Sequence, residues 1–367
     1  MYEKLKHILK NDTVLAVSFL LAVLSCFLVP PDAAYAGYIN THTILTLFCL
    51  MAVMAGLQEL GLFRLIGEQL LHQIHSIRGL VLVLVFLCFV GSMFITNDVA
   101  LITFVPLAIL ILNLSGQQSS LCVTITFMTI AANLGSMLTP IGNPQNLYLY
   151  SVSGMSLGSF LRLMLPYTLL SAVLLIAGIF LACKNRPVTV TLSEKAKMPN
   201  STRLIYYLVL FALCLCCVAG FLSVQILFVI IVLAVLLENK KLLLKVDYGL
   251  LATFICFFIF IGNMGRFPAF RDFIMRILAG NERLVSIGIS QVISNVPAAL
   301  LLSGFTDQWN ELIIGTNIGG LGTLIASMAS LISYKQAVQN DPKSRLHYLL
   351  TFTFWNLVFL VIMLLLP

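Results

Sequence analysis

Two stretches of the chain, residues 132–150 and 316–334, repeat one pattern, and each interrupts an apolar run with residues that break helices. The first reads ANLGSMLTPIGNPQNLYLY and the second reads TNIGGLGTLIASMASLISY. They align without a gap at Asn-x-Gly, at a threonine and at the final tyrosine. Freed backbone N–H and C=O groups cost several kcal/mol each in hydrocarbon unless protein, water or a ligand satisfies them. The sequence therefore predicts two broken membrane helices whose breaks are covered inside the protein.

The composition defines the surroundings of the chain. Of its 367 residues, 60% are hydrophobic and 10% are charged, and the mean hydropathy is +1.03. Soluble domains carry about 25% charged residues, so we expect an all-α integral membrane protein in the lipid bilayer of the cell (inner) membrane. The formal net charge of +7 does not indicate nucleic-acid binding, because the basic residues lie in short loops beside apolar spans.

About nine apolar runs are long enough to cross the bilayer. When residues 1–10 are placed in the cytoplasm, most basic loops fall inside, so we expect a cytoplasmic N-terminus and a C-terminus outside. We read the first run as a retained helix, and a cleaved secretory signal ending near residues 34–36 is the alternative. The expected spans are 12–30, 38–57, 119–148 (broken), 163–183, 204–220, 222–237, 249–264, 311–334 (broken) and 347–366.

Two further apolar stretches, residues 79–113 and 284–304, contain polar residues near their centres. These polar points are Thr96-Asn97-Asp98 in the first stretch and Ser294-Asn295 in the second. Non-helical backbone at membrane depth is tolerated only where protein or a water-filled cavity covers it. We therefore predict two re-entrant hairpins, each with two short helical arms that meet at a polar tip. An ordinary pair of short spans is the alternative.

The order of elements predicts two inverted repeats, each with a span, an interfacial helix, a hairpin, a broken span and a closing span. The interfacial helices are expected at 62–74 and 266–278, where apolar and charged residues alternate with helical spacing. Five crossings separate the openings of the two halves, and an odd number inverts the second half. The expected division is 1–37, an N-terminal helix; 38–183, the first inverted repeat; 184–203, a cytoplasmic linker; 204–248, two connecting helices; and 249–367, the second inverted repeat.

The polar residues at the tips and breaks suit ion binding. The amide carbonyls of Asn97, Asn143 and Asn146 are hard oxygen ligands for a small cation such as sodium. Helix N-termini at the same breaks offer N–H groups and a positive dipole end to an anion. The candidate ion and substrate site comprises Thr96, Asn97, Asp98, Asn133, Gly135, Thr139, Gly142, Asn143, Pro144, Asn146, Ser294, Asn295, Asn317, Gly319, Thr323, Ser327 and Ser330.

Asp98 is the strongest single candidate for a functional residue. An ionisable group inside a membrane span is energetically costly, so its presence there indicates a function. Burial favours its protonated form and a bound cation favours its ionised form, so this carboxylate can exchange a proton for sodium. The second half has Val296 at the matching position. The alternative role for Asp98 is a helix cap.

The paired motifs resemble those of the ion-transporter superfamily. FITNDVALITFVPL is followed by NLGSMLTPIGNPQN, and ISNVPAALLL is followed by TNIGGLGTLIASMAS. The nearest branches are the arsenite-permease and NhaD-type antiporter group and the divalent-anion/sodium symporters, which include citrate-transporter-like proteins. In these symporters, Ser-Asn-Thr tips and a Pro-Pro-Asn-type break bind sodium and a carboxylate, and many relatives are homodimers.

The resemblance carries over to some motifs of this chain and departs at others. Thr96-Asn97-Asp98 and Ser294-Asn295-Val296 stand at the tips, and Asn143-Pro144-Gln145-Asn146 is similar to the family's break. The second break, Ser327-Met328-Ala329-Ser330, has neither the proline nor the final asparagine, which leaves a second, symmetric sodium site open.

These features predict a secondary active transporter with alternating access rather than an enzyme. The preferred substrate is a small carboxylate or inorganic oxyanion, coupled to bound Na⁺ or H⁺, with no other cofactor. A sodium/proton antiporter and an arsenite-type efflux permease are the alternatives, and an ion channel is a more distant one. No H-E-x-x-H motif is present, and Asp98 has no acidic partner within the apolar spans for an acid/base pair.

Overall fold

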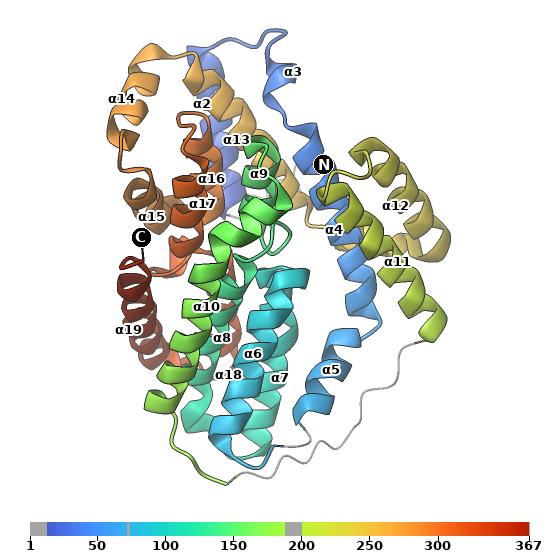
Figure 1. Ribbon diagram of the computed structural model, residues 1–367, viewed down its shortest axis with the longest axis vertical. Helices are drawn as coiled ribbons and strands as arrows, with labels where there is room; N and C mark the ends of the chain where they lie inside the picture. Colours follow the sequence, from blue (N-terminus) through green and yellow to red (C-terminus); the bar gives the residue numbers. More distant parts are fainter. Residues whose placement is uncertain (1–12, 72–73, 188–199, 367) are drawn as a thin grey trace.

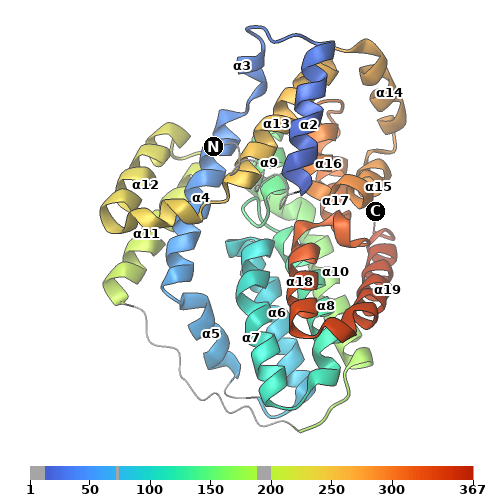
Figure 2. The same cartoon turned by 180° about the vertical axis from the view of Figure 1, so that it is seen from behind.

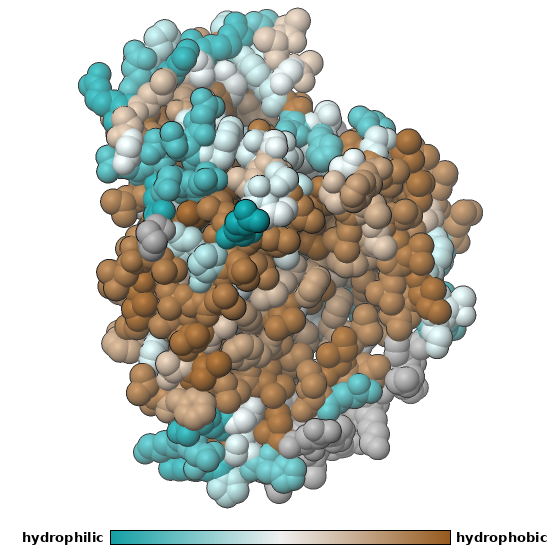
Figure 3. Space-filling model, viewed as in Figure 1, coloured by the Kyte–Doolittle hydropathy of each residue, from teal (hydrophilic) through white to brown (hydrophobic). Residues whose placement is uncertain are grey.

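The computed structural model describes residues 13–71, 74–187 and 200–366, and these form a helical membrane protein (Figure 1). Strands are absent from the described ranges, where an isolated bridge joins Ser76 to Pro187. Eight described helices are long and apolar enough to cross a membrane. On the face shown in Figure 3, hydrophobic residues cover the middle of the molecule and hydrophilic residues gather at its two ends. The expected all-α membrane fold is therefore confirmed.

The first half contains the helices from α2 to α10. Their bounds are α2 Thr13–Leu28, α3 Tyr35–Tyr38, α4 Thr41–Glu59, α5 Leu62–Leu71, α6 Ile77–Ile95, α7 Asn97–Leu114, α8 Leu121–Ser136, α9 Pro144–Ser153 and α10 Leu157–Ala182. The second half contains α11 to α19. Their bounds are α11 Ser201–Val218, α12 Val224–Asn239, α13 Tyr248–Gly265, α14 Pro268–Leu278, α15 Glu282–Ile293, α16 Asn295–Ser303, α17 Trp309–Ile318, α18 Met328–Asn340 and α19 Arg345–Met363.

Both predicted breaks are present. The first lies between α8 and α9, where Asn143 accepts a hydrogen bond from the backbone N–H of Asn146 and Pro144 occupies the first helical position. The second lies between α17 and α18 and contains one short turn, Leu324–Ala326. Each break therefore ends one helix and begins another in the protein interior, where α8 is almost fully buried.

The two hairpins differ in length, as do the expected stretches 79–113 and 284–304. α15 and α16 have 12 and 9 residues, about 18 and 14 Å, which is too short to cross the hydrocarbon core. α6 and α7 have 19 and 18 residues, about 28 and 27 Å, so the expectation of short arms is wrong for the first hairpin. In Figure 1, α6 and α7 run from the lower end of the molecule to about its middle, whereas α15 and α16 lie in the upper half.

The broken helices pack in the core and a separate helix group stands beside them. α8 lies against α6, α7, α10 and α19, and α18 packs on α7 and α8 (Figure 2). α11 and α12 pack on α4 at the other side of the molecule. At this contact Gly56 is required, because a Cβ there would lie 2.2 Å from the Tyr207 ring. We call α4, α11 and α12 the scaffold group, and α6–α9 with α15–α18 the hairpin group.

The N-terminal helix is an integral part of the bundle. α2 runs along α13, and the Asn263 side-chain amide donates to Ser25 Oγ at 2.9 Å and to Tyr35 Oη at 2.7 Å. Arg266 lies 2.8 Å from Asp32 and its hydrogen bond lowers the pKa of that carboxyl. α5 and α14 form short amphipathic helices where the interfacial helices were expected.

Candidate ion and substrate site

Both hairpin tips adopt the same unusual backbone conformation. Thr96 has φ 67° and ψ 153°, and Ser294 has φ 78° and ψ 155°. This region belongs essentially to glycine, and other residues occupy it at a cost of about 1–3 kcal/mol. Immediately after each tip a new helix begins, at Asn97 in α7 and at Asn295 in α16. The duplicated sequence therefore folds into duplicated, strained tips.

The two breaks are joined by a pair of equivalent hydrogen bonds. Asn143 Nδ2 donates to Asn317 Oδ1 at 3.1 Å, and Ser327 Oγ donates to Asn133 Oδ1 at 2.9 Å. In the aligned segments, Asn133 matches Asn317 and Asn143 matches Ser327. Each bond thus connects the Asn-x-Gly asparagine of one half to the residue that begins the second helix of the other half.

The first tip contacts the same cluster. Asn97 Nδ2 donates to Asn133 Oδ1 at 3.2 Å, and the Asn97 backbone N–H donates to the Gly142 carbonyl at 3.1 Å. Asn317 Nδ2 donates to Asn146 Oδ1 at 2.6 Å. The side chains in this cluster are buried, with at most 5% of each exposed. The structure therefore brings the first tip and both breaks together, and we call Asn97, Asn133, Asn143, Asn146, Asn317 and Ser327 the amide cluster.

The three amide oxygens expected to hold sodium already accept one hydrogen bond each. Asn97 Oδ1 accepts from the N–H of Asp98 at 3.0 Å, and Asn143 Oδ1 accepts from the N–H of Asn146 at 2.9 Å. Asn146 Oδ1 accepts from Asn317. A carbonyl oxygen has two lone pairs, so each oxygen keeps one for a further ligand.

The remaining candidates lie around this cluster. Thr139 Oγ1 donates to the Met93 carbonyl at 2.5 Å, and Ser294 Oγ makes long contacts, 3.4 Å from the Ala326 carbonyl. The Ser330 hydroxyl is buried and has no hydrogen-bond partner among the described residues. The glycines permit close approach: a Cβ on Gly135 would lie 2.0 Å from the Phe89 carbonyl oxygen.

Six helix ends meet at the amide cluster, namely the C-terminal ends of α6, α8 and α17 and the N-terminal ends of α7, α9 and α18. The second tip, between α15 and α16, lies against the second break, where Ser294 Oγ is 3.4 Å from the Ala326 carbonyl. Helix N-termini carry free N–H groups and partial positive charge, and C-termini carry free carbonyls and partial negative charge. The arrangement offers donors to an anion and carbonyl oxygens to a cation.

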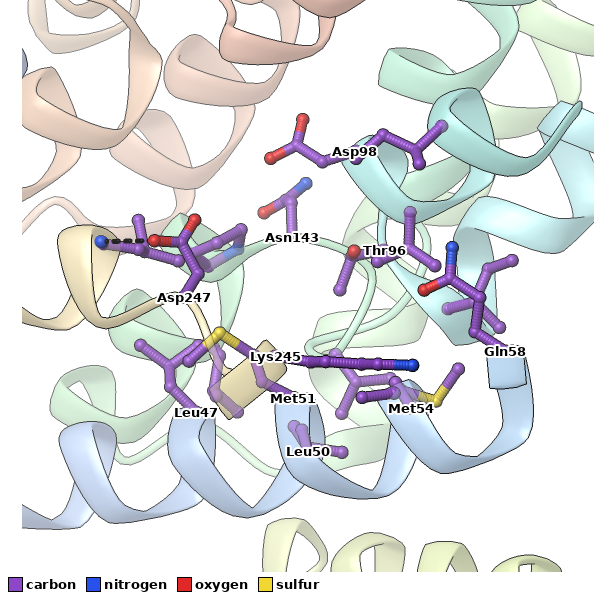
Figure 4. Close-up of a pocket in the computed structure, with 18 residues that line it drawn as sticks. Leu47, Leu50, Met51, Met54, Gln58, Thr96, Asp98, Asn143, Lys245 and Asp247 are labelled. Atoms are coloured by element: carbon purple, nitrogen blue, oxygen red, sulfur yellow. Dashed lines mark hydrogen bonds between the residues drawn. The ribbon is translucent and has the colours of Figure 1, made fainter. Parts of the chain in front are cut away.

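A cavity of about 410 Å³ opens beside the amide cluster. Thr96, Asp98 and Asn143 line it from the hairpin group, and apolar side chains of α4, among them Leu50 and Met54, form the opposite wall (Figure 4). The Asp98 Oδ1 atom is buried and has no hydrogen-bond partner in the described part of the chain. Asp98 therefore lines the cavity and also has a carboxylate oxygen that accepts no hydrogen bond from the described residues.

Three polar cavity residues were missed by the sequence analysis, namely Gln58, Lys245 and Asp247. Lys245 Nζ lies 2.5 Å from Glu59 Oε2, and Asp247 caps α13 by accepting from the N–H of Leu250 at 2.9 Å. Asp247 also places a second carboxylate at the cavity that Asp98 lines, although the sequence analysis found no acidic partner for Asp98 within the apolar spans. An aspartate directly before an apolar helix was the available signal for the Asp247 cap.

Sequence comparisons with known proteins identify the family to which this chain belongs. Residues 5–307 match the family described as Citrate transporter (CitMHS). The uncharacterized transporter MJ0456 of Methanocaldococcus jannaschii is 34% identical over 300 residues, which cover 81% of each chain. The inner membrane protein YbiR of Escherichia coli is 31% identical over 372 residues, covering 98% of this chain and 97% of that protein.

Two further similarities are more limited. The silicon efflux transporter LSI3 of Oryza sativa is 32% identical over 136 residues, which cover 37% of this chain and 27% of that protein. The solved YdaH transporter of Alcanivorax borkumensis aligns over 96% of this chain and 97% of its own, with a TM-score of 0.46 and 12% identity. From the family match and the two longer relatives, this chain is a multi-pass membrane transporter of the CitMHS citrate transporter family, within the ion-transporter superfamily that its motifs resemble.

Proposed function

We propose that this transporter moves a small anion, a carboxylate or an inorganic oxyanion, by secondary active transport coupled to Na⁺ or H⁺. The observation that carries the proposal is the convergence of six helix ends, from the first tip and both breaks, on the buried amide cluster, next to a cavity. Helix N-termini bind anions because backbone N–H groups and the helix dipole point at the ligand. Bound substrate then needs no basic side chain at the tips.

Asp98 would supply the coupling step. Asp98 lines the cavity and its Oδ1 atom has no hydrogen-bond partner among the described residues, so the carboxyl group can take up a proton or coordinate a cation there. A bound cation near the amide cluster would in turn offset the charge of the anion, so the two ligands would favour one another. Coupling of this kind requires each ligand to raise the affinity for the other by the same factor.

We further propose that the hairpin group moves against the scaffold group during transport, with the two halves acting as inverted repeats. The cavity wall on α4 consists mainly of Leu47, Leu50, Met51, Met54 and Ala55. Apolar side chains make no directional bonds that movement would have to break. In keeping with the positive-inside rule, the N-terminus would lie in the cytoplasm, and the exposed apolar faces of α11 and α12 could serve a homodimer.

A specific observation favours cation/proton antiport as the second candidate. Asp98 and Asp247 both line the cavity, and Lys245, which also lines it, is paired with Glu59. The cavity therefore has excess negative charge, which suits a cation. Efflux of a neutral oxyacid, by analogy with the silicon efflux transporter, belongs to the same alternative.

The test is solute uptake by the purified protein in proteoliposomes under imposed Na⁺ or pH gradients. The panel includes citrate, dicarboxylates, sulfate, phosphate and arsenite. Uptake of one anion that depends on a Na⁺ or H⁺ gradient is expected. Cation flux that dissipates a pH gradient without any anion would replace the proposal with antiport.

A further inference from the structure

The side chain of Gln291 fills a ring of backbone carbonyls in the second half. Gln291 lies on α15, three residues before the tip at Ser294. Its Nε2 atom donates to the carbonyls of Ile287 at 3.2 Å, Gly319 at 3.0 Å and Leu321 at 2.9 Å. Three acceptors thus surround one NH₂ group, which has only two protons.

The orientation of this amide is fixed by its partners. Gln291 Oε1 accepts from the backbone N–H of Thr323 at 2.9 Å, and that N–H can only donate. The three carbonyls can only accept, so Nε2 must face them. Two of these carbonyls, Gly319 and Leu321, belong to the break that follows α17, which ends at Ile318, so they lie outside the regular helical hydrogen-bond pattern.

The break is shaped around this side chain. Gly322 has φ 105°, and a Cβ at this position would lie 2.3 Å from Gln291 Oε1. A residue with a side chain would therefore both strain the backbone and displace the amide. Gly322 and Gln291 fit one another, although they belong to different elements.

The matching position of the first half carries no amide. The Thr323 hydroxyl donates to the Gln291 carbonyl at 3.1 Å, and the Thr139 hydroxyl donates to the Met93 carbonyl at 2.5 Å. The two threonines align in the duplicated segments, and Met93 also stands three residues before its tip. Methionine has no N–H group, so the first half lacks the tethered donor of the second half.

Rings of backbone carbonyls are also the ligands that select small cations in membrane proteins. We propose that the Gln291 amide is a tethered substitute for a cation in the carbonyl ring of the second half. An exchangeable coupling ion then binds in the first half only, beside Asp98. This inference rests on the proposed ion-coupled function and adds the half of the molecule in which the ion exchanges.

The test measures the apparent melting temperature (Tm) of the purified protein in equal concentrations of lithium, sodium, potassium, ammonium or N-methylglucamine chloride. Gln291→Ala vacates the ring, so we expect a lower Tm in N-methylglucamine. At least half of this loss should be recovered in one small cation, beyond any cation effect on the wild type. A ligand that binds only the folded state raises stability in this way.

Three further variants control the test. Gln291→Met removes the donors but fills the space, so it should be destabilised without recovery by cations. Met93→Ala, at the matching position, should keep the wild-type cation response. Gln291→Glu keeps the shape and adds a charge, so its Tm should depend on a small cation even where Gln291→Ala does not fold.

Equal changes in Tm for Gln291→Ala and wild type in every cation would overturn the proposal. It would also be overturned if no cation raised the Tm of either Gln291→Ala or Gln291→Glu towards the wild-type value. These measurements involve no transport. A failure of this inference is therefore distinguishable from a failure of the proposed function, which would appear as uncoupled or absent uptake by the wild-type protein in proteoliposomes.

Discussion

Thr96 and Ser294, which are far apart in the sequence, share one backbone conformation that is rare outside glycine. Their φ angles are 67° and 78°, and their ψ angles are 153° and 155°. Among the described residues, they are the non-glycine residues with positive φ. Each lies between two helices whose ends meet the broken helices, so strain is concentrated at the two points where the proposed site is built.

The backbone strain at the second tip should make the stability of the protein depend on which small residue replaces Ser294. Ser294→Gly is expected to be more stable than Ser294→Ala by about 1 kcal/mol, because only glycine adopts the tip conformation freely. The hydroxyl contributes little, since its contacts are 3.4 and 3.5 Å long. Thermal unfolding of both variants in detergent checks this difference, and equal Tm values would show that the tip is not strained.

Asp98→Asn should remove coupling and leave the fold intact. The substitution keeps the size of the side chain and removes a charge whose Oδ1 atom has no described partner. Uptake in proteoliposomes should then lose its dependence on pH and sodium. Asp272→Asn, on the amphipathic helix α14, is the control and should behave as wild type. An unchanged pH and sodium profile for Asp98→Asn would rule out the coupling role.

Asn146→Ala should weaken ion binding and stability more than Ser330→Ala, although the two positions align. The Asn146 amide lies 3.3 Å from the Met137 carbonyl, and its oxygen accepts from Asn317. Its loss leaves buried groups unpaired at about 1–3 kcal/mol each. The Ser330 hydroxyl has no partner among the described residues, so its removal costs little. Ion titrations of both variants by thermal shift are the measurement, and equal losses would indicate two symmetric sites.

The breaks were predictable from the sequence because glycine, proline and asparagine have specific backbone effects. Asn143 followed by Pro144 matches the residue preferences for a helix N-cap and first helical position, and the structure places the start of α9 there. The gathering of the tip and the two breaks followed from the covering that broken backbone requires in a membrane. The breaks depend on the backbone preferences of particular residues, and their covering depends on the membrane around the chain. Both can be read from the sequence, the first from its motifs and the second from its apolar composition.

Other features depend on contacts that no local pattern encodes. Apolar composition is similar in a helix that spans the membrane and in an arm of a re-entrant hairpin, so it does not distinguish the two for α6 and α7. Asp247 and Lys245 lie between the expected spans 222–237 and 249–264. The packing of the short turn Lys240–Lys245 and of α13 against α4 brings them to the cavity with Asp98. No local pattern marks Gln291, because the Gly319 and Leu321 carbonyls that its amide contacts lie about thirty positions further along the chain.

Gly142 should tolerate no side chain. A substitution there should also disturb the first hairpin tip at Thr96 and Asn97. A Cβ on Gly142 would lie 2.1 Å from the Ser136 carbonyl oxygen, which is backbone and cannot move aside cheaply. The Gly142 carbonyl accepts from the N–H of Asn97, so a displaced Gly142 also displaces the start of α7. Gly142→Ala should therefore lower stability by about 1–3 kcal/mol and reduce uptake in proteoliposomes.

Gly158→Ala provides the matched control for this prediction. Gly158 lies in the first turn of α10, and the nearest atom to a Cβ there is 4.0 Å away. Alanine has the higher helix propensity, by up to about 1 kcal/mol, so Gly158→Ala should be neutral or stabilising. Because both variants add one methyl group, a similar fall in Tm and uptake for the two would contradict a specific role of Gly142. A loss confined to Gly142→Ala would show that the first break positions the first tip.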